Sequence, residues 1–289
     1  MASVDRPTAF WLRLLRQRRA RIGEETLDLE VPITWDSPEE KTAAVAFFNA
    51  AFRAEESGLR QAHEIADSVA TWDPELAETL RLYGDEEGWH RQLLTEFIAY
   101  LGGEIRPMGP TTRTFYKLYA RAERHATIVL TNLMFETIGA TTYRLALRTA
   151  KSHPAIRQML TILTRDESFH VPLNVHFLRR ILEHEEPGAL VRLRPLYHLL
   201  TAALMASAAA SRRRAKRFDN IPFKTLARAY AEHLGRLFMT TEDFGLKPSR
   251  VLLATVGLRR ADLRGGEDLL SVEAAERSAD RAQVVVEAL

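Results

Sequence analysis

The 289-residue sequence contains no cysteine. A chain without cysteine has no disulfide bond, no thiolate zinc site, no iron–sulfur cluster and no cysteine nucleophile. It also lacks an excess of either charge, because 40 Lys and Arg residues face 38 Asp and Glu residues. This balance argues against binding to nucleic acid, where a surplus of positive charge neutralises the phosphates.

Long apolar runs are absent as well. The longest, Leu199 to Ala210, has about 12 residues, whereas a membrane-spanning helix needs about 20. The first 21 residues place arginines among a short apolar set, without the apolar core and small-residue cleavage site of a signal peptide. We therefore expect a cytoplasmic protein with no transmembrane segment. Its basic N-terminal helix either packs on its own domain or lies on a membrane surface.

Strand signals are nearly absent, since the sequence has no Asn-Gly or Asp-Gly hairpin and no sustained alternation of apolar and polar residues. Helix-start signals are frequent, with an N-cap residue directly before Pro38 and Pro74. The predicted fold class is all-α, with four long helices at about 38–70, 74–102, 118–151 and 154–186. We expect a basic N-terminal arm over 1–36, a four-helix bundle over 37–186 and a helical extension over 187–289.

The bundle follows from an internal repeat. When the sequence is shifted by 80 residues, several unusual positions coincide without a gap. The matched pairs include Pro74 with Pro154, Glu56 with Glu136, Glu87 with Glu167 and His90 with His170. Two copies of one helical hairpin predict a four-helix bundle in which the hairpins are related by a pseudo-two-fold axis.

Each predicted helix carries an apolar stripe that polar residues interrupt near its middle. The interrupting residues are Glu56, Glu87, His90, Glu136, Glu167 and His170. Isolated ionised carboxylates are costly to bury, so these groups must be paired or bound to a cation. A Glu and a His three residues apart lie on one helix face and can bind the same ion. The pattern predicts two divalent metal ions, and a network of Glu–His hydrogen bonds without metal is the alternative.

These residues give the chain a resemblance to the ferritin-like diiron-carboxylate oxidase and oxygenase family, over about 38–186. The motifs that carry it are Glu87-Gly88-Trp89-His90 and Glu167-Ser168-Phe169-His170, together with Glu56 and Glu136. Glu55 competes with Glu56 for the first position, and the repeat favours Glu56. The resemblance also implies that Asp166 supports His90, and Glu86 supports His170, from outside the ligand set. A solvated helix charge is the alternative for both acids.

The resemblance implies O₂ chemistry at two iron ions, with Fe/Mn or Mn/Mn as the other possible pairs. Leu94 and Asn174 stand where a radical-forming Tyr is found in the family, and Leu163 stands where an extra His marks arylamine N-oxygenases. We expect an O₂-dependent oxidoreductase that hydroxylates, N-oxygenates, desaturates or cleaves a small organic or carrier-bound substrate. A ferroxidase or peroxide-scavenging protein and a non-enzymatic bundle are the alternatives.

Other residues on the same stripes are candidates for a substrate pocket or a proton relay. Tyr83 lies one turn before Glu87, and two more residues lie seven positions after a predicted ligand. The candidates are His63, Tyr83, Ala140, Thr141 and Tyr143. The alternative is that they are ordinary core and helix-packing residues.

The C-terminal extension is predicted to form helices near 190–216, 222–242 and 248–258. The apolar face of 199–210 is expected to cover the bundle and close the pocket, or to form a homodimer contact. The chain has no haem motif, cysteine or dinucleotide-binding glycine motif, so turnover requires an external electron donor. A basic cluster is a candidate docking site for an acidic redox partner, or simply a helix end favoured by the macrodipole: Arg212, Arg213, Arg214, Lys216 and Arg217.

Overall fold

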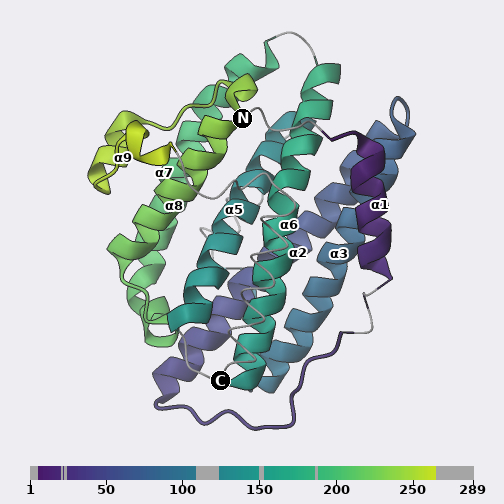
Figure 1. Ribbon diagram of the computed structural model, residues 1–289. Helices are drawn as coiled ribbons and strands as arrows, with labels where there is room; N and C mark the ends of the chain where they lie inside the picture. The colour runs from purple at the N-terminus through teal and green to yellow at the C-terminus, as the bar shows by residue number, and fades with distance from the viewer. Residues whose placement is uncertain are drawn as a thin grey trace. The chain divides into compact units, whose positions relative to one another are not determined.

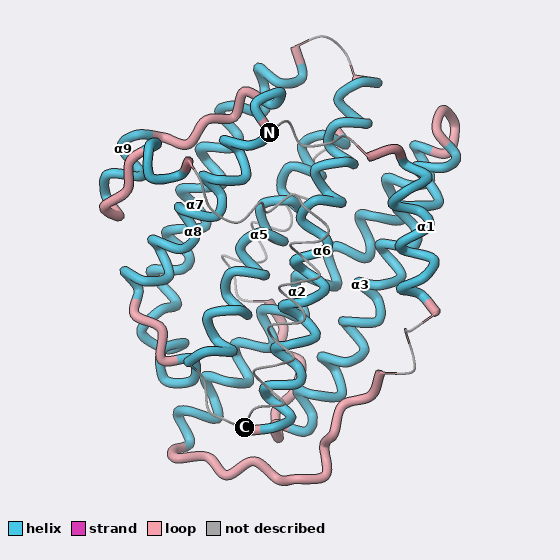
Figure 2. Tube along the Cα trace, in the orientation of Figure 1, coloured by secondary structure: helices cyan, strands magenta, loops and turns pink. Residues whose placement is uncertain are grey.

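A computed structural model describes residues 6–20, 22, 25–108, 124–149, 153–185 and 188–264. Within these ranges the chain forms helices, turns and loops and no strand, which confirms the all-helical prediction (Figures 1 and 2). The chain divides into two compact units, Asp5–Ile128 and a second that consists mainly of Val129–Leu289. In the described ranges no helix combines the length and apolar character that a membrane crossing requires.

The first unit contains the helices α1 (Thr8–Arg19), α2 (Pro38–Val69) and α3 (Pro74–Tyr100). The predicted starts of the two long helices are confirmed by their caps. The Ser37 side chain accepts a hydrogen bond from the Glu40 amide, and the Asp73 side chain accepts one from the Leu76 amide. Each cap satisfies one of the free amides in the first turn, and the proline that follows has no amide to satisfy.

A short connection joins α2 and α3 into a hairpin whose two helices run side by side (Figure 1). Phe48 of α2 and Phe97 of α3 are buried and meet edge to face, with ring centroids 4.7 Å apart. The other end of α3 stops where Gly102 takes a positive φ of 69°. A glycine adopts this left-handed conformation without strain, so the Gly102-Gly103 stop signal acts as predicted.

The basic N-terminal helix packs against α3. Its apolar side chains Trp11, Leu12 and Leu15 are buried. Its arginines make three ion pairs with acids of α3, namely Arg16 with Glu78, Arg18 with Glu86 and Arg19 with Asp85. The helix therefore packs on its own unit, which was one of the two expectations for it.

The second unit contains α5 (His125–Thr149) from Val129 onward, α6 (Pro154–His184), α7 (Ala189–Asp219) and α8 (Phe223–Thr240). The predicted start of α6 at Pro154 is confirmed. The predicted start of the third helix near 118, its end near 151 and the final residues of the expected bundle near 186 lie outside the described residues. Whether the two hairpins form one four-helix bundle stays a prediction.

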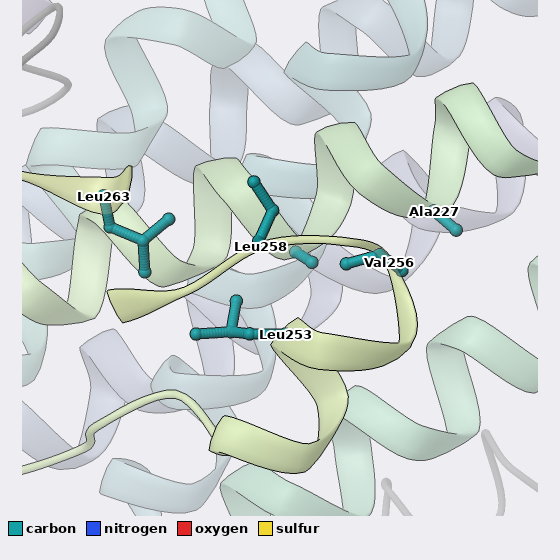
Figure 3. Close-up of a cluster of buried hydrophobic side chains, with 6 residues drawn as sticks. Ala227, Leu253, Val256, Leu258 and Leu263 are labelled. Carbon is teal, nitrogen blue, oxygen red and sulfur yellow. The ribbon is translucent and has the colours of Figure 1, made fainter. Parts of the chain in front are cut away.

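Beyond α8 the chain forms η1 (Glu242–Phe244), α9 (Arg250–Thr255) and η2 (Arg260–Leu263). The helix predicted over 248–258 is shorter than expected because the chain turns at Gly257, where φ is 72°. Figure 3 shows side chains of this segment gathered with Ala227 of α8. The buried cluster comprises Ala227, Ala231, Leu253, Val256, Leu258 and Leu263. It anchors the segment to α8 by burial of apolar surface.

The apolar stretch of α7 is only partly covered. Leu200 and Thr201 are buried, whereas Leu199 is 66% exposed. A helix with one buried stripe and one exposed stripe packs on its unit along one side only. One face of the stretch is therefore buried, and both expectations for it, covering the bundle or forming a homodimer contact, stay predictions.

Candidate metal centre

The first unit places an acid of α2 beside the histidine of α3. His90 is fully buried, and its Nδ1 lies 3.3 Å from Oε2 of Glu55. Glu87, three residues before His90, is also buried. Its carboxylate occupies the space left by Gly58 of α2, because a Cβ built on that glycine would lie 2.8 Å from Glu87 Oε2. We call Glu55, Glu87 and His90 the first half-site.

The second unit repeats this arrangement. His170 of α6 is fully buried, and its Nδ1 lies 3.5 Å from Oε2 of Glu136 on α5. The same nitrogen lies 3.6 Å from Oε2 of Glu167, three residues earlier on α6. All three side chains are almost entirely excluded from solvent. We call Glu136, Glu167 and His170 the second half-site.

The spacing of these atoms suits metal binding. Two donors that share one ion through bonds of about 2.0–2.2 Å lie roughly 3–3.5 Å apart. The separations of 3.3, 3.5 and 3.6 Å between imidazole nitrogen and carboxylate oxygen are close to this range. Buried Glu, Asp and His residues that can hold a metal ion are thus present in both units. Nitrogen and carboxylate donors suit iron, manganese and zinc alike, so the donor set does not select one of these metals.

The structure corrects the choice of ligand on α2. The predicted ligand Glu56 has a side chain that is 36% exposed and is bound by two arginines. Arg53 Nη1 lies 2.5 Å from Glu56 Oε2, and Arg91 Nε lies 3.8 Å from Glu56 Oε1. Neighbouring helical residues point about 100° apart, so only one of the two acids can face His90. That acid is Glu55.

The error arose from the register of the repeat. Glu55 precedes Glu87 by 32 residues, whereas Glu136 precedes Glu167 by 31. The shift of 80 that aligns the second helices must therefore become 81 for the first helices. At that shift Glu55-Glu56-Ser57-Gly58 aligns with Glu136-Thr137-Ile138-Gly139. A Glu followed three residues later by Gly is the sequence signal that identifies Glu55.

The two acids predicted to support the histidines are both buried, and an arginine holds each of them. Arg18 of α1 donates from Nε to Glu86 Oε1 at 2.9 Å. Arg165 donates from Nε and Nη2 to the two oxygens of Asp166, at 2.7 and 2.8 Å. An oxygen of Glu86 also lies within 4.8 Å of a nitrogen of His90 in the same helix. The predicted pairs, Asp166 with His90 and Glu86 with His170, each join residues of different units and stay predictions.

The pocket candidates have different environments. Tyr83, Ala140 and Tyr143 are buried. His63 is not buried with them, because its side chain is 40% exposed and its Nε2 lies 3.3 Å from an oxygen of Asp85. Thr141 is buried and donates to the backbone oxygen of Thr137. The ion pair holds His63 at a partly exposed position, and its role in a pocket stays a prediction.

Sequence reasoning assigned no role to His233 of α8. Its Nδ1 lies 2.6 Å from the hydroxyl oxygen of Thr141 on α5. Burial lowers the pKa of His233 to about 4, and Arg144, Arg236 and Arg148 add to this effect. No motif in the sequence links positions 92 residues apart, so only the packing of α8 on α5 reveals this contact.

The basic residues near the end of α7 differ in exposure to solvent. Arg212 is buried and pairs with Asp219, which is fully buried. It therefore belongs to the interior of the unit, which corrects its assignment to a docking surface. The side chains of the other members are exposed, and they are Arg213, Arg214, Lys216 and Arg217.

Comparison with protein-family models, curated proteins and solved structures finds no match to this chain.

Proposed function

We propose that the chain is an O₂-dependent oxidoreductase with two metal ions, most simply iron, held by residues of the two half-sites. The observation that carries this proposal is that each unit buries the same donor set, one Glu plus a Glu-x-x-His pair, with oxygen and nitrogen at metal-ligand separations. The prediction that the half-sites form one dinuclear centre comes from the sequence repeat. The corrected ligand set is Glu55, Glu87, His90, Glu136, Glu167 and His170.

The buried position of these ligands is the first argument for a metal. Four carboxylates in low-dielectric surroundings are costly unless cations compensate them. Two divalent ions supply this compensation and use the histidine nitrogens as well. Nδ1 of His170 lies 3.5 Å from Glu136 Oε2 and 3.6 Å from Glu167 Oε2. Both separations are longer than an ordinary hydrogen bond and suit donor atoms that share one ion.

When bound, two iron ions of this kind supply electrons for the reduction of O₂ coupled to oxidation of an organic substrate. The protein's own residues bind and orient the ions and keep bulk water away from them. Gly58 leaves room for Glu87, and Phe52 and Leu94 are buried residues on the same two helices. Without cysteine or a dinucleotide motif, the chain depends on an external electron donor.

The exposed basic residues of α7 are the proposed docking site for that donor. Arg213, Arg214, Lys216 and Arg217 offer positive charge to an acidic protein. Reversing the charges of Arg213 and Arg214 is expected to slow electron delivery at low salt and to have little effect at high salt. Equal effects at both salt concentrations would contradict docking through charge.

The test of the proposed function begins with iron loaded without oxygen. The protein should retain about two iron ions per chain after removal of unbound metal, as measured by elemental analysis. On exposure to O₂ with reductant and organic substrate present, oxygen uptake should match substrate oxidation. Sustained Fe(II) oxidation without any organic substrate would instead support the ferroxidase alternative, and retention of less than half an ion per chain would reject a metal centre.

A further inference from the structure

Three of the four proposed carboxylate ligands have a second acid directly beside them in the sequence. The pairs are Glu55 with Glu56, Glu87 with Glu86, and Glu167 with Asp166. Two adjacent helical residues point in directions about 100° apart, so a change of one residue in the register of the helix would exchange them. The protein therefore needs a means to determine which acid of each pair binds the metal.

In the first unit, arginines bind the acid that is not the proposed ligand. Arg18 donates to Glu86 from Nε at 2.9 Å and also from Nη2, and only 21% of its side chain is exposed. Arg53 and Arg91 bind Glu56. Arg18 comes from α1, outside the hairpin that carries the ligands, whereas the other two arginines lie on the hairpin helices themselves.

In the second unit, an arginine again binds the acid that is not the proposed ligand, but this arginine lies on the same helix as the acid. Arg165 forms a two-pronged contact with Asp166, with donor–acceptor distances of 2.7 and 2.8 Å. Asp166 is fully buried, and the arginine is its direct neighbour in the sequence. A planar guanidinium matches the two oxygens of a carboxylate in this geometry.

The other acid of each pair, which is the proposed ligand, lies in a half-site. Glu55 lies 3.3 Å from His90, and Glu167 lies 3.6 Å from His170. The carboxylate of Glu87 lies against Gly58 of α2. In all three pairs, one acid is thus placed in a half-site and its neighbour is held by arginine.

Electrostatics explains why an arginine would exclude its partner from the metal. A guanidinium occupies the lone pairs that a metal ion would use, and its charge repels a divalent cation nearby. A buried acid deprived of its arginine would carry uncompensated charge, and a metal ion bound nearby would attract it.

We propose that these arginines determine which acid of each pair binds metal, and that Arg18 does so for Glu86 and Glu87. This inference rests on the proposed metal centre. Arg18 is a positioning residue that acts through Glu86 and does not touch the ions. The N-terminal helix thereby contributes to the ligand set of a site on two other helices.

The experiment uses Co(II), whose visible absorption reports the number and geometry of its ligands. Arg18→Gln should change the spectrum of bound cobalt and lower the affinity for one of the two ions by about tenfold. This is in the range typical for loss of a residue that supports a ligand. The double variant Arg18→Gln/Glu86→Gln removes the released carboxylate and should return both spectrum and affinity toward the wild type. Glu86→Gln alone is the reference for the double variant, and the two should have the same cobalt spectrum and affinity, because Arg18 has no carboxylate to hold once Glu86 is replaced.

Arg16→Gln is the matched control. Arg16 lies on the same helix and pairs with Glu78 of α3, but both side chains are largely exposed. This variant should bind cobalt as the wild type does. The inference is overturned if Arg18→Gln leaves the spectrum unchanged, or if the double variant is as impaired as Arg18→Gln rather than equal to Glu86→Gln. A wild-type protein that binds no cobalt and no iron would overturn the proposed function itself, and this inference with it.

Discussion

In the first unit the acid before the proposed ligand glutamate is held by an arginine from a separate helix, whereas in the second unit that acid is held by the arginine next to it in the sequence. The donor set is the same in both: a glutamate on one helix and a Glu-x-x-His pair on the next. Arg18 and Arg165 thus reach equivalent acids, Glu86 and Asp166, by different routes. The two copies of the repeat thus keep the same proposed ligand types, while the arginines that hold the neighbouring acids come from different places in the chain.

The two first helices differ in a second respect. A Cβ at Gly58 would lie 2.8 Å from Glu87 Oε2, whereas a Cβ at Gly139 would lie 3.9 Å from the nearest Glu167 atom. The two halves also differ in their neighbours, because α5 of the second unit bonds to α8 through Thr141 with His233 and Thr142 with Tyr230. The first half-site is therefore the tighter of the two around its glycine.

The largest expected effect separates the two acids of α2. Glu55→Ala should lose at least one of the two ions, because it removes the carboxylate beside His90. Glu56→Ala should retain both ions, since its side chain is 36% exposed and bound by arginine. Elemental analysis of both variants after identical iron loading measures the difference. Loss of metal in Glu56→Ala with retention in Glu55→Ala would restore the choice that the gapless repeat favours.

A second prediction compares an ion pair from each unit. Arg212→Ala leaves Asp219 as a buried carboxylate without its arginine, so the free energy of unfolding should fall by about 3–5 kcal/mol. Arg16→Ala breaks an exposed pair and should cost less than about 1 kcal/mol. Urea unfolding of the metal-free protein gives both values. Equal costs would mean that burial does not distinguish the two pairs.

A third prediction concerns pH and the contact between α5 and α8. Burial lowers the pKa of His233 to about 4, so the folded protein binds its proton less readily than the unfolded chain does. The contribution of His233 to the free energy of unfolding is fully present above the unfolded pKa of about 6.5. It is lost as pH falls toward 4, by about 3 kcal/mol in all. Unfolding of metal-free protein between these pH values, compared with His233→Gln, isolates the contribution. An identical pH dependence in the variant would remove His233 as its source.

The smallest effect tests the glycines of the two half-sites. Gly58→Ala should displace Glu87 and weaken metal binding by about tenfold. Gly139→Ala meets only ordinary contacts and should leave metal affinity unchanged while stabilising α5 by about 0.5–1 kcal/mol. Titration with Co(II) and thermal unfolding measure the two quantities. Equal loss of affinity in both variants would show that the half-sites are equally tight.

Local signals in the sequence were sufficient for much of the fold. Ser37-Pro38 and Asp73-Pro74 identify helix starts because an N-cap side chain and a proline act within one turn. The length of α9 could not be obtained in this way, because its end depends on the turn at Gly257 and on packing against α8. Boundaries set by tertiary packing leave little trace in a single sequence.

The candidate site shows the same division. The Glu-x-x-His pairs stand out in the sequence because both residues lie on one helix face. Glu56 was preferred to Glu55 because the two hairpins differ by one residue between their acids, and a gapless comparison hides such a difference. Arg18 was missed because its partner Glu86 is 68 residues away and on another helix. Contacts of that separation require the fold.

The most direct test of the central claim is the magnetic state of the bound iron. Mössbauer spectroscopy of iron-loaded, air-oxidised protein should show about two iron ions per chain with a diamagnetic ground state, because two ferric ions that share carboxylate ligands are antiferromagnetically coupled. His90→Ala in one unit should then disturb the iron bound by the other. Two independent paramagnetic ions, or a His90→Ala variant whose remaining iron is unaltered, would show that the half-sites do not form one centre.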